Sequence, residues 1–165
     1  MQIEPLSVAV HAVANLANFR ATQTIAVWGA GPVGLLCMAV AKALGAARVI
    51  AIDIVPSRLE FAKNYVATDI FLPPTPNPNE DKMEYSKRCA DAVMKEFGLQ
   101  ERGGADTVDL AVDASGAEPS IQTALHVVKA GGTFIQVRLV DRAVLSVKSQ
   151  FHTSSVWELQ MSRYP

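Results

Sequence analysis

Three glycines and one aspartate in this sequence have the types and the spacing that dinucleotide binding requires. Gly29, Gly31 and Gly34 follow a short apolar run and open a second apolar stretch with helical spacing. In a strand–turn–helix unit, the first glycine allows a tight turn, the second lets a pyrophosphate approach the backbone, and the third lets the helix pack closely on the strand. The unpaired amides and the positive end of the helix dipole then face the phosphates. The pattern therefore predicts a phosphate-binding turn at residues 29–34.

Asp53 supplies the second part of this predicted site. It ends the next apolar run, 19 residues after Gly34, close to the roughly 20 residues expected of the acid that binds an adenosine ribose. A carboxylate there accepts hydrogen bonds from two ribose hydroxyls but repels a 2′-phosphate, which favours NAD over NADP. Arg58 is an alternative partner for a 2′-phosphate. We favour NAD because the acid stands at the strand end, where the ribose must lie.

Alternating strands and helices must position these residues. The predicted strands are Thr24–Trp28, Arg48–Asp53, Asp69–Leu72, Val108–Val112 and Thr133–Val137. The predicted helices are Pro5–Ala17, Val33–Leu44, Pro56–Tyr65, Lys82–Phe97 and Pro119–Val128. Residues 73–79 contain four prolines and are predicted to form a surface loop. Asp106 and Asp109, near the start of a predicted strand, are interpreted as turn residues. The order predicts an α/β fold, a doubly wound parallel sheet of the Rossmann type, with its ligand at the carboxyl ends of the strands.

Composition narrows the class of protein. The chain has 165 residues, a net charge of −1 and 50% hydrophobic residues, which suits one folded domain and indicates no nucleic-acid partner. Cys37 and Cys89 have neither metal-ligand spacing nor a disulfide pattern. No secretory leader and no apolar run of about 20 residues is present. We therefore expect a cytoplasmic protein without a membrane partner, which binds a small dinucleotide and is compatible with a homo-oligomer.

Several segments together resemble a known family. They are the Glu4-Pro5-Leu6-Ser7 motif within residues 3–12, the glycine turn, and the segments 113–118 and 131–137. This combination resembles the zinc-dependent polyol dehydrogenases of the medium-chain superfamily, most of all the fungal xylitol dehydrogenases (D-xylulose reductases). The resemblance covers residues 1–137 and implies transfer of a hydride between a polyol and NAD.

The resemblance also implies roles for individual residues. Asp53 would hold the adenosine ribose, Arg58 would lie beside the adenine, and Val33 would contact the pyrophosphate. Ser115 and Val137 would border the nicotinamide. The full set of expected cofactor-binding residues is Gly29, Gly31, Pro32, Val33, Gly34, Asp53, Arg58, Ser115 and Val137.

Zinc is the other cofactor that the resemblance implies. In the family, the glutamate that corresponds to Glu4 lies next to the catalytic zinc, while a cysteine and a histidine–glutamate pair come from a GroES-like catalytic domain upstream. We expect that domain to be absent here and the isolated chain to be inactive, because a catalytic zinc needs three protein ligands. His11, His126 and His152 are isolated and are not expected to bind metal.

Three segments are expected: a linking helix from the missing catalytic domain (1–22), the Rossmann domain (23–137) and a divergent tail (138–165). The tail departs from the family after Val137. Back-translation of residues 156–162, read one nucleotide earlier, permits Gly-Met-Gly-Ala-Pro-Asp-Val, which resembles the family's continuation. We hypothesise that residues 138–155 are translated intron and that the last ten are out of frame. Such a tail, including Phe151, Val156 and Trp157, is expected to be disordered or weakly packed.

Two other functions fit parts of the pattern. One is a non-catalytic NAD-binding module. The other is an S-adenosylmethionine-dependent methyltransferase, whose first strand can also precede a glycine turn and an acid. The complete glycine pattern and Glu4-Pro5-Leu6-Ser7 disfavour the methyltransferase.

Overall fold

A computed structural model describes residues 3–100, 106–138, 143–150 and 156–163. These residues contain a seven-stranded sheet in the order β3-β2-β1-β4-β5-β6-β7. The strands are β1 (Thr24–Trp28), β2 (Arg48–Ile52), β3 (Asp69–Phe71), β4 (Val108–Asp113), β5 (Val128–Arg138), β6 (Ala143–Gln150) and β7 (Val156–Arg163). The helices are α1 (Ile3–Val10), the π-helical η1 (His11–Leu16), α2 (Pro32–Ala43), α3 (Pro56–Tyr65), α4 (Lys82–Phe97) and α5 (Glu118–Val127).

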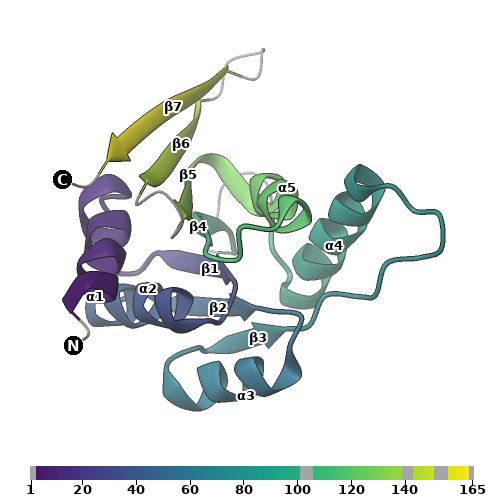
Figure 1. The fold of residues 1–165 in the computed structure, drawn as a ribbon, viewed down its shortest axis with the longest axis horizontal. Helices are drawn as coiled ribbons and strands as arrows, with labels where there is room; N and C mark the ends of the chain where they lie inside the picture. Colours follow the sequence, from purple (N-terminus) through teal and green to yellow (C-terminus); the bar gives the residue numbers. More distant parts are fainter. Residues whose placement is uncertain (1–2, 101–105, 139–142, 151–155, 164–165) are drawn as a thin grey trace.

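Strands β1 to β5 run parallel, so the predicted doubly wound α/β fold is confirmed. The chain leaves β1 toward β2 and β3 on one side and returns to β4 on the other side. This change of direction between β1 and β4 is the point where open α/β sheets bind ligands. Figure 1 shows the glycine turn's two elements, β1 and α2, beside this point.

Helices cover both faces of the sheet. Alternate residues of β1 divide between the faces: Ile25 and Val27 pack with α1, α2 and α3, whereas Ala26 and Trp28 pack with α4 and α5. Figure 1 shows α4 and α5 side by side on their face of the sheet. Strands buried on both faces explain the unbroken apolar runs in the sequence.

Local signals place the helix ends close to their predicted positions. Asp81 caps α4, where its carboxylate accepts hydrogen bonds from the amides of Met83 and Glu84 at 2.8 Å. Gly98 ends the same helix in the left-handed region, with φ of 64°, as glycine commonly does. The first helix differs from the prediction, because its second half, His11–Leu16, is π-helical.

None of the described helices has the length and apolar character needed to cross a membrane.

Asp109 is not a turn residue, so that prediction was wrong. It lies within β4, and its carboxylate accepts a hydrogen bond from the amide of Thr24 at 2.8 Å and pairs with Lys129. Asp109 therefore joins the starts of β1, β4 and β5. A charged residue can occupy this strand because both of its carboxylate oxygens have partners.

The C-terminal segment continues the sheet. Strand β6 pairs antiparallel with β5, and β7 pairs antiparallel with β6, as Figure 1 shows at the end of the sheet. Residues 143–150 and 156–163 are therefore extended strands of this sheet, and Phe151 lies outside the described residues. The expectation that the tail is disordered or weakly packed stays a prediction. Without β6, β5 would be an edge strand with a free row of backbone donors and acceptors.

Candidate cofactor-binding site

Two of the three glycines sit where a side chain would collide with backbone. A Cβ at Gly34 would lie 1.8 Å from the carbonyl oxygen of Gly29, and a Cβ at Gly29 would lie 2.9 Å from the amide nitrogen of Ser115. Gly29 also has φ of 99°, a region that glycine alone adopts readily. The amide of Gly29 donates to the carbonyl of Ile52 at 2.7 Å. These contacts lock the turn between β1 and α2.

Gly31 has a different environment from the other two glycines. It is the residue that caps α2, and a Cβ built on it would meet nothing within 4 Å. Pro32 follows at the first helical position, and no side chain among the described residues caps the helix. Open space therefore lies beside Gly31 at the amide end of α2, and an anionic group suits such a place.

Asp53 holds the glycine turn against the end of β2. Its carboxylate accepts hydrogen bonds from the amides of Ala30 at 2.7 Å and Val55 at 2.8 Å. The guanidinium of Arg58 lies 3.8 Å from the same carboxylate, whose side chain is 5% exposed while that of Arg58 is 59% exposed. Because each carboxylate oxygen has two lone pairs, these contacts leave acceptor capacity for a ligand.

Asp113 begins the segment 113–118 that carries part of the family resemblance, but no role for it was predicted, and it shapes the turn that follows β4. It ends β4, is fully buried, and accepts hydrogen bonds from the amide and hydroxyl of Ser115 and from the amide of Gly116 at 2.7–3.1 Å. Burial raises the pKa of the Asp113 carboxyl group above its ordinary value. An aspartate at a strand end, followed within three residues by serine and glycine, is a typical signal for such a turn.

The structure brings together most of the residues expected to bind the cofactor. The glycine turn, Asp53 and Ser115 lie at the carboxyl ends of β1, β2 and β4, and Arg58 lies in the first turn of α3 beside Asp53. Val33 is buried in the first turn of α2, and Val137 is buried near the end of β5. Their contact with a cofactor stays a prediction.

Glu4 is exposed in the first turn of α1. Among the described residues, no group of three histidine, cysteine or acidic side chains could hold a metal ion. The described part of the chain therefore does not by itself fit a zinc ion.

A cavity lies next to the turns. It has a volume of about 470 Å³ and is mainly apolar. Trp28 and Ile52, which directly precede Gly29 and Asp53, line it together with Ile54. The proline-rich loop, α4 and α5 also contribute lining residues. The sequence analysis missed this cavity, because it is formed by side chains from segments far apart in the chain.

Comparison with known proteins agrees with this architecture. The model of the family described as "Zinc-binding dehydrogenase" matches residues 32–159. The chain is 50% identical over 134 residues to D-xylulose reductase A of Aspergillus oryzae, a match that covers 81% of this chain and 34% of the relative. The chain thus spans about a third of the length of the curated relatives it matches. The matches favour a dehydrogenase over both alternative functions.

Solved structures give the same result for the fold. An alcohol dehydrogenase from Thermus sp. ATN1 is similar with a TM-score of 0.59 and 30% identity, covering 81% of this chain and 34% of that one. L-idonate 5-dehydrogenase from Escherichia coli is similar with a TM-score of 0.61 and 28% identity, covering 81% and 32%.

Proposed function

The chain belongs to the zinc-binding dehydrogenase family, and from that membership we propose that it is the NAD-binding part of a polyol oxidoreductase of the xylitol/D-xylulose class. The observation that carries the proposal is the turn at residues 29–34. Its backbone excludes side chains at Gly29 and Gly34, its helix end is open, and Asp53 lies directly beside it. The 50% identity to a D-xylulose reductase supports the proposed substrate class.

In this proposal each part of the site binds one part of the cofactor. The amide end of α2, with Gly31, Pro32 and Val33, holds the pyrophosphate. Asp53 accepts the ribose hydroxyls, and Arg58 lies near the adenine. Ser115 and Val137 border the nicotinamide, which exchanges a hydride with the polyol when NAD is bound. Asp113 acts indirectly, since it fixes the turn that carries Ser115.

The proposal assigns a zinc ion to the complete enzyme and not to the described part of this chain. The described residues do not form a metal site, and we assign Glu4 only a place near the zinc of a complete protein, as the family resemblance implies. We expect the isolated chain with NAD, xylitol and zinc to form no NADH. Formation of NADH, followed by its absorbance, would contradict that expectation.

Fluorescence of Trp28 offers a direct test of cofactor binding, because this residue lines the cavity beside the glycine turn. A Trp157→Phe background leaves Trp28 as the single tryptophan, since the chain has two. We expect saturable quenching by NADH and weaker binding of NADPH, because Asp53 repels a 2′-phosphate. Replacement by Asp53→Ala should reduce this preference. Binding of S-adenosylmethionine without binding of NADH would instead support the methyltransferase alternative.

The origin of the tail is a separate proposal. We propose that residues 138–155 are translated intron sequence and that the following residues are out of frame. Two observations count against this proposal: the family match runs on to residue 159, and β6 pairs with both β5 and β7. Sequencing of the spliced transcript decides the matter, since an in-frame coding sequence across residue 138 would exclude the proposal. Light scattering of the purified chain tests whether it forms a homo-oligomer.

A further inference from the structure

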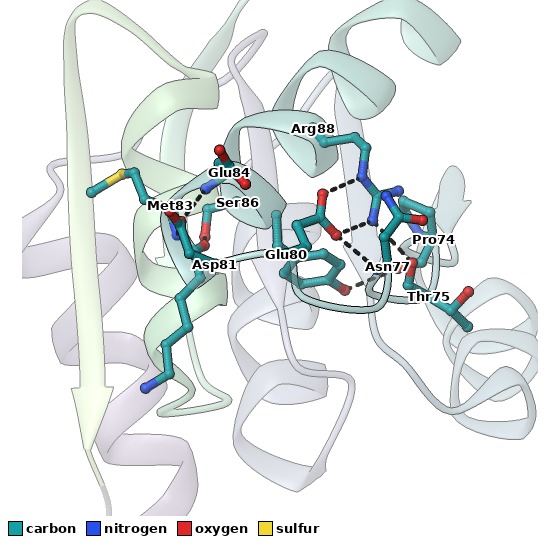
Figure 2. Close-up of polar contacts among 11 residues, drawn as sticks. Pro74, Thr75, Asn77, Glu80, Asp81, Met83, Glu84, Ser86 and Arg88 are labelled. Carbon is teal, nitrogen blue, oxygen red and sulfur yellow. Dashed lines mark hydrogen bonds and ion pairs between the residues drawn. The ribbon is translucent and has the colours of Figure 1, made fainter.

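The loop of residues 72–80, here called the proline loop, is held on α4 by one arginine. Arg88 donates from Nε and Nη2 to the two carboxylate oxygens of Glu80, each at 2.7 Å, and from Nη2 to the carbonyl oxygen of Thr75 at 2.9 Å. The amide of Asn77 donates to Glu80 at 2.9 Å. Figure 2 shows Arg88 above the loop, with Glu80, Thr75 and Asn77 gathered around its guanidinium. A single side chain of α4 thus contacts both arms of the loop.

Tyr85 adds a second attachment. Its hydroxyl donates to the carbonyl oxygen of Pro74 at 3.0 Å, and the Arg88 guanidinium lies 5.5 Å from the centre of its ring. Burial raises the pKa of Tyr85 to about 12, so the hydroxyl keeps its proton at neutral pH. The hydrogen bond from Arg88 lowers the pKa of Glu80 to about 2, so the carboxylate keeps its charge.

The loop depends on these side chains because it has few backbone donors of its own. Pro73, Pro74, Pro76 and Pro78 lack an amide hydrogen. Residues 72–79 form neither helix nor strand. The contacts with Glu80, Arg88 and Tyr85 therefore decide where the loop lies.

The inner side of the loop forms one wall of the cavity described above. Leu72 to Pro76 line the cavity, as do Tyr85 from α4, Trp28 and Ile54. If Asp53 holds the adenosine ribose, the base attached to that ribose extends into this apolar space.

We propose that Arg88 is a positioning residue for cofactor binding: through Glu80 and Thr75 it holds the proline loop as the outer wall of the pocket that takes the adenine ring. This inference rests on the proposed function. Arg88 itself is not among the residues lining the cavity, and it acts by fixing the loop before the cofactor arrives. A loop that is already in place loses less conformational entropy on binding.

The test compares ligands that contain or lack the adenine. In the Trp157→Phe background, Arg88→Met should weaken NADH and AMP binding about tenfold, which corresponds to roughly 1.4 kcal/mol, and leave binding of reduced nicotinamide mononucleotide unchanged. Arg88→Lys should not restore the affinity, because an ammonium group cannot make the paired contacts of a guanidinium. Lys87→Met is the matched control. It removes one positive charge from an exposed neighbouring position on the same helix and should bind like the parent.

Other results overturn the inference. Equal NADH affinity for the parent and Arg88→Met would show that the loop contacts do not influence binding, and equal losses for NADH and reduced nicotinamide mononucleotide would indicate general damage. If Arg88→Met does not fold, Glu80→Gln takes its place, because it removes the same ion pair while preserving the side-chain shape. A parent chain that binds no NADH refutes the proposed function itself, whereas a binding parent with unaffected variants refutes only the role of Arg88.

Discussion

The proline loop lines the cavity that lies next to the glycine turn, and different forces hold these two segments. Backbone packing fixes the turn, since side-chain atoms at Gly29 or Gly34 would overlap main-chain atoms. Side chains fix the loop, through Glu80, Arg88 and Tyr85. A glycine packed against backbone, such as Gly29 or Gly34, tolerates almost no substitution, whereas a loop held by side chains can be loosened one contact at a time. The following predictions use this difference.

The largest effect is expected at Gly34. A Cβ there would lie 1.8 Å from the backbone oxygen of Gly29, so Gly34→Ala must move α2 away from β1. We expect a loss of about 3 kcal/mol or more in the free energy of unfolding, measured by urea denaturation with circular dichroism. Stability within the error of the parent would show that the turn is less rigid than its contacts indicate.

A substitution at Gly31 should weaken ligand binding but have little effect on stability, unlike a substitution at Gly34 in the same turn. Its φ of −78° suits any residue, and a Cβ added to it would have no other atom within 4 Å. Gly31→Ala should therefore change the free energy of unfolding by less than about 1 kcal/mol. It should nevertheless weaken NADH binding at least about tenfold, because the added methyl group occupies the space of the pyrophosphate. Calorimetric titration measures this affinity, and unchanged NADH binding would place the phosphates elsewhere.

The proline loop should respond to pH through Glu80. Its pKa falls from 4.5 to about 2 in the folded chain, chiefly through Arg88. Because the folded pKa is the lower one, the ion pair contributes its full stability above about pH 4.5 and loses it as the pH falls toward 2. Over that range Glu80→Gln should show a shallower decline than the parent in the urea concentration at half-unfolding. Parallel declines would indicate that the pair does not stabilise the fold.

Features were predicted correctly from the sequence where a glycine or a proline restricts the backbone locally. The glycine spacing, the proline that begins α3, and Gly98 at the end of α4 each restrict the backbone locally. The prediction failed at Asp109, because partners as distant as Thr24 and Lys129 decide its environment. The cavity and the Arg88 contacts were missed for the same reason, since neither is visible before the chain has folded.

The smallest effect is expected at an ion pair that resembles the one in the loop but is more exposed. Lys82 and Glu118 join the starts of α4 and α5, with side chains 67% and 57% exposed, whereas those of Arg88 and Glu80 are 34% and 9% exposed. Water weakens exposed pairs, so Lys82→Met should change the free energy of unfolding by less than about 0.5 kcal/mol and leave NADH affinity unchanged. A double-mutant cycle with Glu118→Gln measures the coupling of this pair. If that coupling equals the coupling of Arg88 with Glu80, burial is not what gives the loop contacts their strength, and the contrast between the two pairs disappears.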